Sequence, residues 1–217
     1  MIRPLNHSSK KQEDAQNIRQ QIVVATNNTG KISEIQTILH DFMCQIVPIQ
    51  KFQSQFFVEE DGQTYEDNAI KKARAAARVT GEIAIADDSG LEIDALGGAP
   101  GLYSARFGGE NLSFPEKIAL LLKQLEGVTS RTARFRCAIA LVSPDGNVKT
   151  AEGVCEGLIG TEARGTHGFG FDPIFIVPHF QKTMAELDPA VKNTISHRAQ
   201  ALKQLPELIK SFLSAPI

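Results

Sequence analysis

The chain has 217 residues, of which 42% are hydrophobic, so it can bury a sizeable core without the help of disulfides. Its 23 Lys and Arg residues against 25 Asp and Glu residues leave a net charge of −2, which argues against binding to nucleic acid or to an anionic membrane surface. The three cysteines form no Cys-x-x-Cys pair, which argues against a disulfide framework or a zinc site and favours a reducing, cytoplasmic setting.

The first 20 residues carry several charges and no apolar stretch typical of a secretory signal. We therefore expect residues 1–20 to form a flexible leader. The longest apolar runs of the chain are far shorter than the ~18 residues that cross a bilayer, so no association with a membrane is expected.

The β-branched run of residues 22–26 predicts a buried strand, and it leads into a small polar loop at residues 27–31. A helix is predicted over residues 30–40, because Ile32, Ile35 and Ile38 fall on one face. A polar loop between a strand and a helix N-terminus is the geometry of a phosphate site. Taken alone, however, the loop favours a plain strand-to-helix connection whose Asn and Thr residues cap the helix. The loop is not a Walker A motif, which requires glycine at position 25.

Residues 45–49 predict a second strand, and an acidic segment at residues 59–61 follows it. Thr64 and Asp67 are typical of a capping box, which predicts a helix that continues to Thr80 and ends at Gly81. The basic side chains of this helix are expected to face solvent, because no aromatic residues are interleaved with them; they are Lys71, Lys72, Arg74 and Arg78.

A strand over residues 83–86 is predicted to end at Asp87-Asp88-Ser89-Gly90, and the alternating residues from Leu91 are expected to turn back as a paired strand. Adjacent side chains on a strand point to opposite faces, so the two carboxylates are expected to do different jobs. Glu59 and Glu60 are further carboxylates that could take part in the site, and no His or Cys pair is nearby. Any metal held here is therefore expected to be a hard ion such as Mg²⁺. An ordinary turn is the alternative.

The Ser113 and Glu116 capping box predicts a helix over residues 113–125. Residues 132–143 and 147–159 read as a long hairpin, which makes the predicted sheet mixed. A short strand at 174–177 and helix over 194–214, interrupted at Pro206, complete the prediction.

Glycine-flanked Phe169 and Phe171, with Lys182 and the pair His197-Arg198 downstream, are candidates for holding a planar, anionic ligand. Core packing for the rings and helix capping for the last pair are the alternatives. Together with the polar loop and the acidic residues, these elements supply what a nucleoside triphosphate needs: a phosphate cradle, cations, a carboxylate for a metal and a stacking surface.

Five motifs follow one another along the chain: Thr26–Lys31, Ala86–Leu91, Leu96–Gly101 with Tyr103–Arg106, Gly168–Pro173 and Ile195–Arg198. In this order they resemble the motifs of the bacterial-type inosine triphosphatase family, also called the Ham1-like family or non-canonical purine NTP pyrophosphatases. The resemblance covers about residues 21–214. Phe171 stands where many relatives have Tyr or Trp, so the aromatic ring is kept and only a hydroxyl contact is lost.

The resemblance implies a two-lobed α/β fold, with a long, twisted, mixed sheet flanked by helices and a central cleft, formed by residues 21–217 as a single domain. It also implies a homodimer. Asp88 would be the catalytic carboxylate, and Glu59 with Asp88 would hold Mg²⁺. The implied substrate-binding residues are Thr26, Asn27, Asn28, Thr29, Gly30, Lys31, Ser89, Phe169, Gly170, Phe171, Asp172, Lys182, His197 and Arg198.

The implied reaction is hydrolysis of ITP, dITP and XTP between the α- and β-phosphates, which gives a nucleoside monophosphate and pyrophosphate. A site that donates hydrogen bonds to a 6-oxo group would reject adenine, whose 6-amino group is itself a donor. Two alternatives remain at this point: a nucleotide-binding sensor without catalysis, and a sister pyrophosphatase that acts on modified pyrimidine nucleotides.

Overall fold

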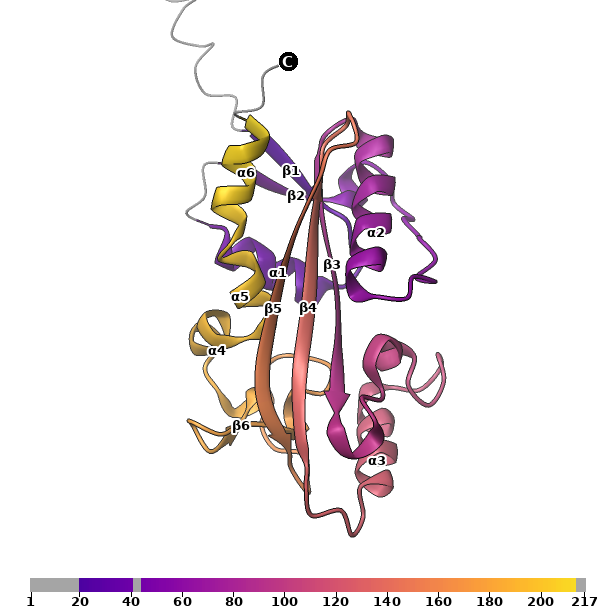
Figure 1. Cartoon of the computed structure of the whole chain (residues 1–217), viewed down its shortest axis with the longest axis vertical. Helices are drawn as coiled ribbons and strands as arrows, with labels where there is room; N and C mark the ends of the chain where they lie inside the picture. The colour runs from indigo at the N-terminus through magenta and orange to yellow at the C-terminus, as the bar shows by residue number, and fades with distance from the viewer. Residues whose placement is uncertain (1–19, 41–43, 214–217) are drawn as a thin grey trace, which may run out of the picture.

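The computed structural model describes residues 20–40 and 44–213, which form one mixed β-sheet with helices on its faces (Figure 1). The strand order is β2-β1-β3-β4-β5-β6-β7, in which β1 runs parallel to β2 and β3 while the later pairs are antiparallel. This confirms the expected mixed α/β fold. The strands are β1 (Gln20–Val24), β2 (Cys44–Pro48), β3 (Ile83–Ile93), β4 (Thr132–Val142), β5 (Val148–Ile159), β6 (Phe175–Val177) and β7 (Lys182–Thr183).

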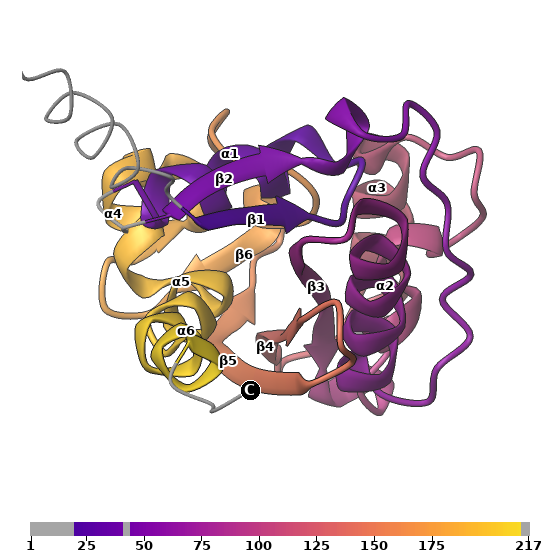
Figure 2. The same ribbon diagram turned by 90° about the horizontal axis from the view of Figure 1, so that it is seen from above.

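Residues 1–19 of the expected leader lie outside the described residues, and the single two-lobed domain over 21–217 stays a prediction. Figure 2 shows α2 on one side of the sheet and α5 with α6 on the other. Within the described ranges, no helix is long and apolar enough to cross a membrane. The helices are α1 (Thr29–Ile38), α2 (Tyr65–Thr80), α3 (Phe114–Gln124), α4 (Pro189–Ile195), α5 (His197–Leu202) and α6 (Leu205–Leu213).

The helix boundaries read from capping residues are confirmed. Thr64 and Asp67 form a reciprocal capping box at the start of α2, and Gly81 ends that helix in the left-handed conformation with φ 71°. The Ser113 and Glu116 box starts α3 in the same way. The long hairpin is also confirmed, as β4 and β5.

The predicted chain reversal after Gly90 is wrong, because β3 is one continuous strand. It pairs with β4 from Ala84↔Val142 to Ile93↔Ala133, so the Asp87-Asp88-Ser89-Gly90 segment lies in the middle of a strand. Asp, Ser and Gly favour turns on their own. Here β4 offers backbone partners along the whole segment, and buried cations neutralise the carboxylates.

The predicted interruption near Pro206 is present at residues 203–204, directly before α6, and the helical region has a further break that the sequence did not predict. The helical region breaks at Ser196, which has extended φ and ψ of −63° and 157°, and again after Leu202. Pro206 is the second residue of α6, where the missing N–H costs no hydrogen bond. The first break matters for the site, since α5 begins with His197 and Arg198.

Three apolar clusters form the core, and one of them packs Ile118 and Leu121 of α3 together with Leu91 and Phe135 of the sheet. A second contains Ile22, Ile85 and Ile139, with α1, α5 and α6 packed on them. On the other face, the alanine stripe of α2 packs against Ala84, Ala86 and neighbouring strands. Small residues let α2 lie close to the sheet, so polar side chains at its N-terminal half reach β3.

Candidate active site

One cavity of about 680 Å³ gathers most of the residues predicted from sequence. It is lined by the loop before α1, the segment before α2, the middle of β3, and the loop and helices near the C-terminus. The sequence-predicted residues that line it are Thr26, Asn27, Asn28, Lys31, Glu59, Asp88, Ser89, Phe169, Gly170, Phe171, Asp172, His197 and Arg198.

Three of the predicted site residues do not line this cavity. Thr29 and Gly30 are the first residues of α1, and a Cβ at Gly30 would lie 2.6 Å from the Phe169 ring, so glycine makes room for that ring. Lys182 lies in β7, the strand at the edge of the sheet beyond β6, and its side chain is exposed. Lys192 from α4 lines the cavity instead.

Hydrogen bonds from its own side chains fix the conformation of the loop before α1, which lines the cavity. Asn28 Oδ1 accepts a hydrogen bond from the Lys31 N–H at 3.1 Å, which caps the helix, and Thr26 Oγ1 accepts from the Asn28 N–H at 3.2 Å. Asn27 Nδ2 donates to the Phe56 carbonyl at 2.6 Å. The loop therefore caps α1 and also presents the positive end of that helix to the cavity.

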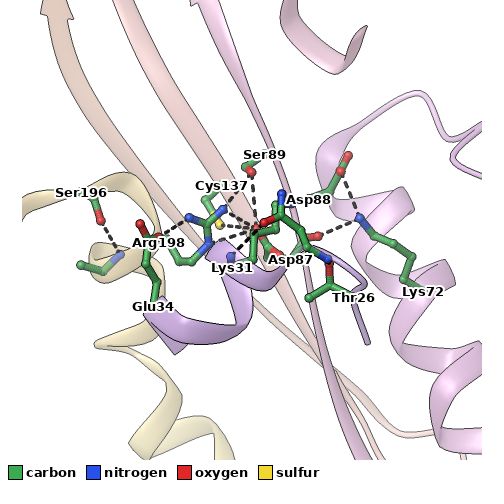
Figure 3. A network of polar contacts seen from close by, with 12 residues as sticks. Thr26, Lys31, Glu34, Lys72, Asp87, Asp88, Ser89, Cys137, Ser196 and Arg198 are labelled. Carbon is green, nitrogen blue, oxygen red and sulfur yellow. Dashed lines mark hydrogen bonds and ion pairs between the residues drawn. The ribbon is translucent and has the colours of Figure 1, made fainter. Parts of the chain in front are cut away.

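Asp87 is buried beneath the cavity and organises cations (Figure 3). Its Oδ2 accepts from Arg198 Nη2 at 2.7 Å and Nε at 3.1 Å, and lies 3.0 Å from Lys31 Nζ. Burial opposes ionisation, but Arg198 and Lys31 hold the pKa of this carboxyl far below its usual value. Asp87 is therefore a permanent anion that fixes both cations.

A chain of ion pairs leads from Arg198 to the loop of residues 168–172, which contains Phe169 and Phe171. Glu34 accepts from Arg198 Nη1 at 2.5 Å and lies 2.8 Å from Lys192 Nζ. Lys192 also pairs with Asp172, whose Oδ2 accepts from the Phe169 N–H at 2.9 Å. Lys192 Nζ and the Arg198 guanidinium lie 4.7 and 5.6 Å from the centre of the Phe169 ring. The ring is thus fixed beside two cations.

Asp88 points to the opposite face of β3, as the alternation predicts (Figure 3). Its oxygens meet Lys72 Nζ at 3.1 Å and Asn68 Nδ2 at 3.0 Å. Burial raises the pKa of the Asp88 carboxyl above its usual value, although Lys72 and Lys31 oppose the rise. A carboxylate with a raised pKa is a better proton acceptor near neutral pH.

The expectation that Lys72 faces solvent is wrong, because only 7% of this residue is exposed. Its Nζ donates to Glu60 at 2.6 Å and to the Asp87 carbonyl at 2.7 Å, in addition to Asp88. The sequence held a signal, since Lys72 falls on the same helical stripe as Ala69, Ala73 and Ala76. Sequence reasoning also missed Glu34 and Lys192, which stand in no recognisable motif. It assigned no role to Arg106, although this residue ends one of the five family motifs.

His197 forms part of the cavity wall as a neutral side chain. Its ring stacks on Phe135 with centroids 4.8 Å apart. Burial, with Arg198 and Lys192 nearby, holds its pKa well below the usual value. Its Nδ1 is buried with no hydrogen-bond partner among the described residues.

The acidic residues of the cavity fit a hard cation. Glu59, Glu60 and Asp88 offer only carboxylate oxygens, which suit Mg²⁺ and not zinc. Within the described part of the chain, no three acidic, His or Cys side chains converge into a complete metal site. Mg²⁺ is usually bound by one or two carboxylates, with phosphate and water as the other ligands.

The Ham1 family model matches residues 22–208, which include every residue of the site. The chain belongs to the Ham1 family. The dITP/XTP pyrophosphatase of Desulforamulus reducens is 55% identical over 190 residues, which are 87% of this chain and 94% of that protein. The protein of the same name from Bacillus subtilis is 47% identical over 196 residues, 89% and 99% of the two chains.

Solved structures of the Ham1 family share this fold. A HAM1 protein from Coxiella burnetii superposes with a TM-score of 0.80 at 46% identity, over 88% of this chain and 99% of that one. The Ham1 protein of Staphylococcus aureus gives 0.79 at 44% identity, over 89% and 100%. The family resemblance inferred from the five motifs is confirmed.

Proposed function

We propose that this Ham1-family chain is a dITP/XTP pyrophosphatase that hydrolyses ITP, dITP and XTP between the α- and β-phosphates. The observation that carries the proposal is the meeting of Asp88, the polar loop and Phe169 in one cavity. Relatives that bear this name match the chain at 47 to 55% identity over nearly their whole length.

The protein residues provide the proton acceptor and the charge for this reaction. Asp88 accepts a proton from the attacking water, and Lys72 orients Asp88 by its hydrogen bond. Lys31 and the helix N-terminus behind it offset the negative charge of the phosphates. Glu59 and Asp88 would hold Mg²⁺, which would supply further neutralisation of the charge on the leaving pyrophosphate.

The aromatic end of the cavity suits a 6-oxopurine. Phe169 offers a ring face for stacking, and Gly170 follows it in the same loop. Phe171 is buried in edge contact with Phe107 and Phe114. Donors from neutral His197 and from backbone amides would bind the 6-oxo group and would meet adenine's amino group donor to donor.

We also infer a cytoplasmic location and a homodimer, which the family resemblance implies. Cys44, Cys137 and Cys155 are free thiols, as expected in a reducing compartment. Phe57 is 87% exposed and is a candidate for burial by a second copy. Sedimentation equilibrium of the purified chain tests the dimer.

An end-product assay tests the activity. The purified chain with Mg²⁺ is offered ITP, XTP, dITP, GTP, ATP and dUTP separately, and monophosphate plus pyrophosphate is resolved from diphosphate plus phosphate. We expect pyrophosphate from ITP, dITP and XTP, with ATP and GTP nearly untouched.

The other outcomes separate the two alternatives. Tight nucleotide binding without turnover would indicate a sensor. Preferential release of pyrophosphate from a modified pyrimidine nucleotide would leave the role of Asp88 in place and refute the purine assignment.

A further inference from the structure

Arg106 differs from the other cations of the cavity because, among the described residues, no carboxylate forms a direct ion pair with it, although its charge helps to lower the pKa of Glu60. Five cationic side chains line the cavity, and four are paired with carboxylates: Lys31, Lys72, Lys192 and Arg198. Within residues 20–40 and 44–213, the hydrogen bond of Arg106 is a 3.2 Å contact from Nη2 to the Glu60 carbonyl. An arginine has five N–H donors, so most of its donors remain available to a ligand.

The backbone around Arg106 is fixed, so its side chain starts from a defined place. Arg106 ends a 3₁₀ segment, Gly101–Arg106, that follows β3. Ser104 Oγ accepts from the Leu91 N–H at 2.8 Å, which ties the segment to β3. Lys117 of α3, a buried lysine, donates to the Ala105 carbonyl at 2.5 Å. The half-buried guanidinium therefore extends from an anchored base toward the segment before α2.

Arg106 lies at the carboxylate end of the cavity. Its contact residue Glu60 pairs with Lys72, which in turn pairs with Asp88. At the other end, Phe169 lies beside Lys192 and Arg198. A nucleotide whose base stacks on Phe169 and whose α-phosphate meets Asp88 would extend its outer phosphates toward Arg106.

We propose that Arg106 is a further substrate-binding residue, which binds the two outer phosphates and hence the pyrophosphate product. This inference rests on the proposed function. On binding, the guanidinium exchanges a single long hydrogen bond to a neutral carbonyl for charge-assisted, forked bonds to phosphate oxygens.

Calorimetric titration of the full chain with pyrophosphate and, separately, with IMP tests the assignment, both in buffer with Mg²⁺. In Arg106→Gln, we expect pyrophosphate affinity to fall by on the order of 10- to 100-fold and IMP affinity to stay unchanged. Arg106→Lys keeps the charge and loses the fork, so its affinity should be intermediate. Arg78→Gln, which removes an exposed arginine of α2 outside this cavity, is the matched control and should bind both as the wild type does.

Unchanged pyrophosphate affinity in Arg106→Gln, or an equal loss for pyrophosphate and IMP, would overturn the proposal. Thermal unfolding of each variant shows whether it is folded, and Arg106→Lys provides a second folded variant if the glutamine form is not. The titration needs no turnover. Failure of the proposed function would appear as a wild-type chain that releases no pyrophosphate from ITP or XTP, whatever Arg106 does.

Discussion

Asp87 and Asp88 follow one another in β3, and their side chains leave the sheet on opposite faces. Asp87 meets Arg198 and Lys31 in a buried ion cluster, whereas Asp88 meets Lys72 and Asn68 at the cavity. The same residue type therefore has a depressed pKa at one position and a raised pKa at the next. Replacement of Asp88 should therefore lower the activity, whereas replacement of Asp87 should lower the stability of the fold.

Asp88→Asn removes the proton acceptor and keeps the shape of the side chain. We expect kcat for ITP to fall roughly 100- to 10,000-fold while the thermal midpoint changes little. In the wild type, kcat/KM should fall as the pH drops through the raised pKa of Asp88. Asp94→Asn, at an exposed carboxylate beyond the end of β3, is the matched control for steady-state assays. Activity in Asp88→Asn within tenfold of wild type would contradict the role.

Asp87→Asn leaves the buried Arg198 without its anion. We expect the free energy of unfolding at pH 7 to drop by about 3–5 kcal/mol, as when one partner of a buried ion pair is removed. Because the folded pKa of Asp87 lies below the unfolded value, its stabilisation is complete above about pH 4 and declines below it.

Urea unfolding at pH 7 and at about pH 3.5 measures this effect. The difference in the free energy of unfolding between wild type and Asp87→Asn should shrink at the lower pH. Glu126→Gln, at an exposed carboxylate after α3, is the control and should stay within about 0.5 kcal/mol of wild type at pH 7. A gap that does not change with pH would show that ionisation of Asp87 is not the source of the stability.

At the scale of elements, α5 places His197 and Arg198 because it lies directly against β5. A Cβ at Gly153 of β5 would come within 2.1 Å of the His197 carbonyl and 2.6 Å of the Ala201 nitrogen. Both atoms belong to the backbone, so no side chain can turn away. Ser196, fully buried, ends α4 and caps α5 by accepting from the Ala199 N–H.

Gly153→Ala should therefore push α5 away from the sheet and lower the free energy of unfolding by roughly 1–3 kcal/mol. The KM for ITP should rise, because Arg198 moves with the helix. Gly160→Ala is the matched control, since its Cβ would meet the flexible tip of Ile176 at 3.3 Å. Urea unfolding and steady-state kinetics compare them, and equal losses in both variants would refute the role of close packing.

Local signals in the sequence predicted the helices and strands better than they predicted the contacts between them. Capping residues predicted the ends of α2 and α3, and the hydrophobic period together with the turn residues predicted β4 and β5. The prediction of a chain reversal at Gly90 was wrong because turn propensity depends only on neighbouring residues. The partner strand β4, which keeps this segment extended, lies about 50 residues further along the chain. The pairing of Arg198 with Glu34 spans 164 positions and follows no motif, so only the fold reveals it.

At the scale of the whole molecule, the cavity is assembled from segments that are remote in the sequence. Lys31 comes from α1, Lys72 from α2, Asp88 from β3 and Arg198 from α5. Phe169 comes from a loop between β5 and β6. A nucleotide that contacts all of them links the start of the described chain to its end, so binding should stabilise the fold as one unit.

A non-hydrolysable ITP analogue with Mg²⁺ should raise the midpoint of thermal unfolding. At about 100 times its Kd, the stabilisation is about 2.7 kcal/mol, which corresponds to roughly 5–10 °C for a chain of this size. The matching ATP analogue at the same concentration should shift the midpoint much less, because its 6-amino group meets donors at the base site. Phe169→Ala, which removes the stacking ring, should reduce the difference between the two analogues. Equal shifts from both analogues in the wild type would mean that the phosphates alone are recognised, and would remove the base selectivity from the proposed function.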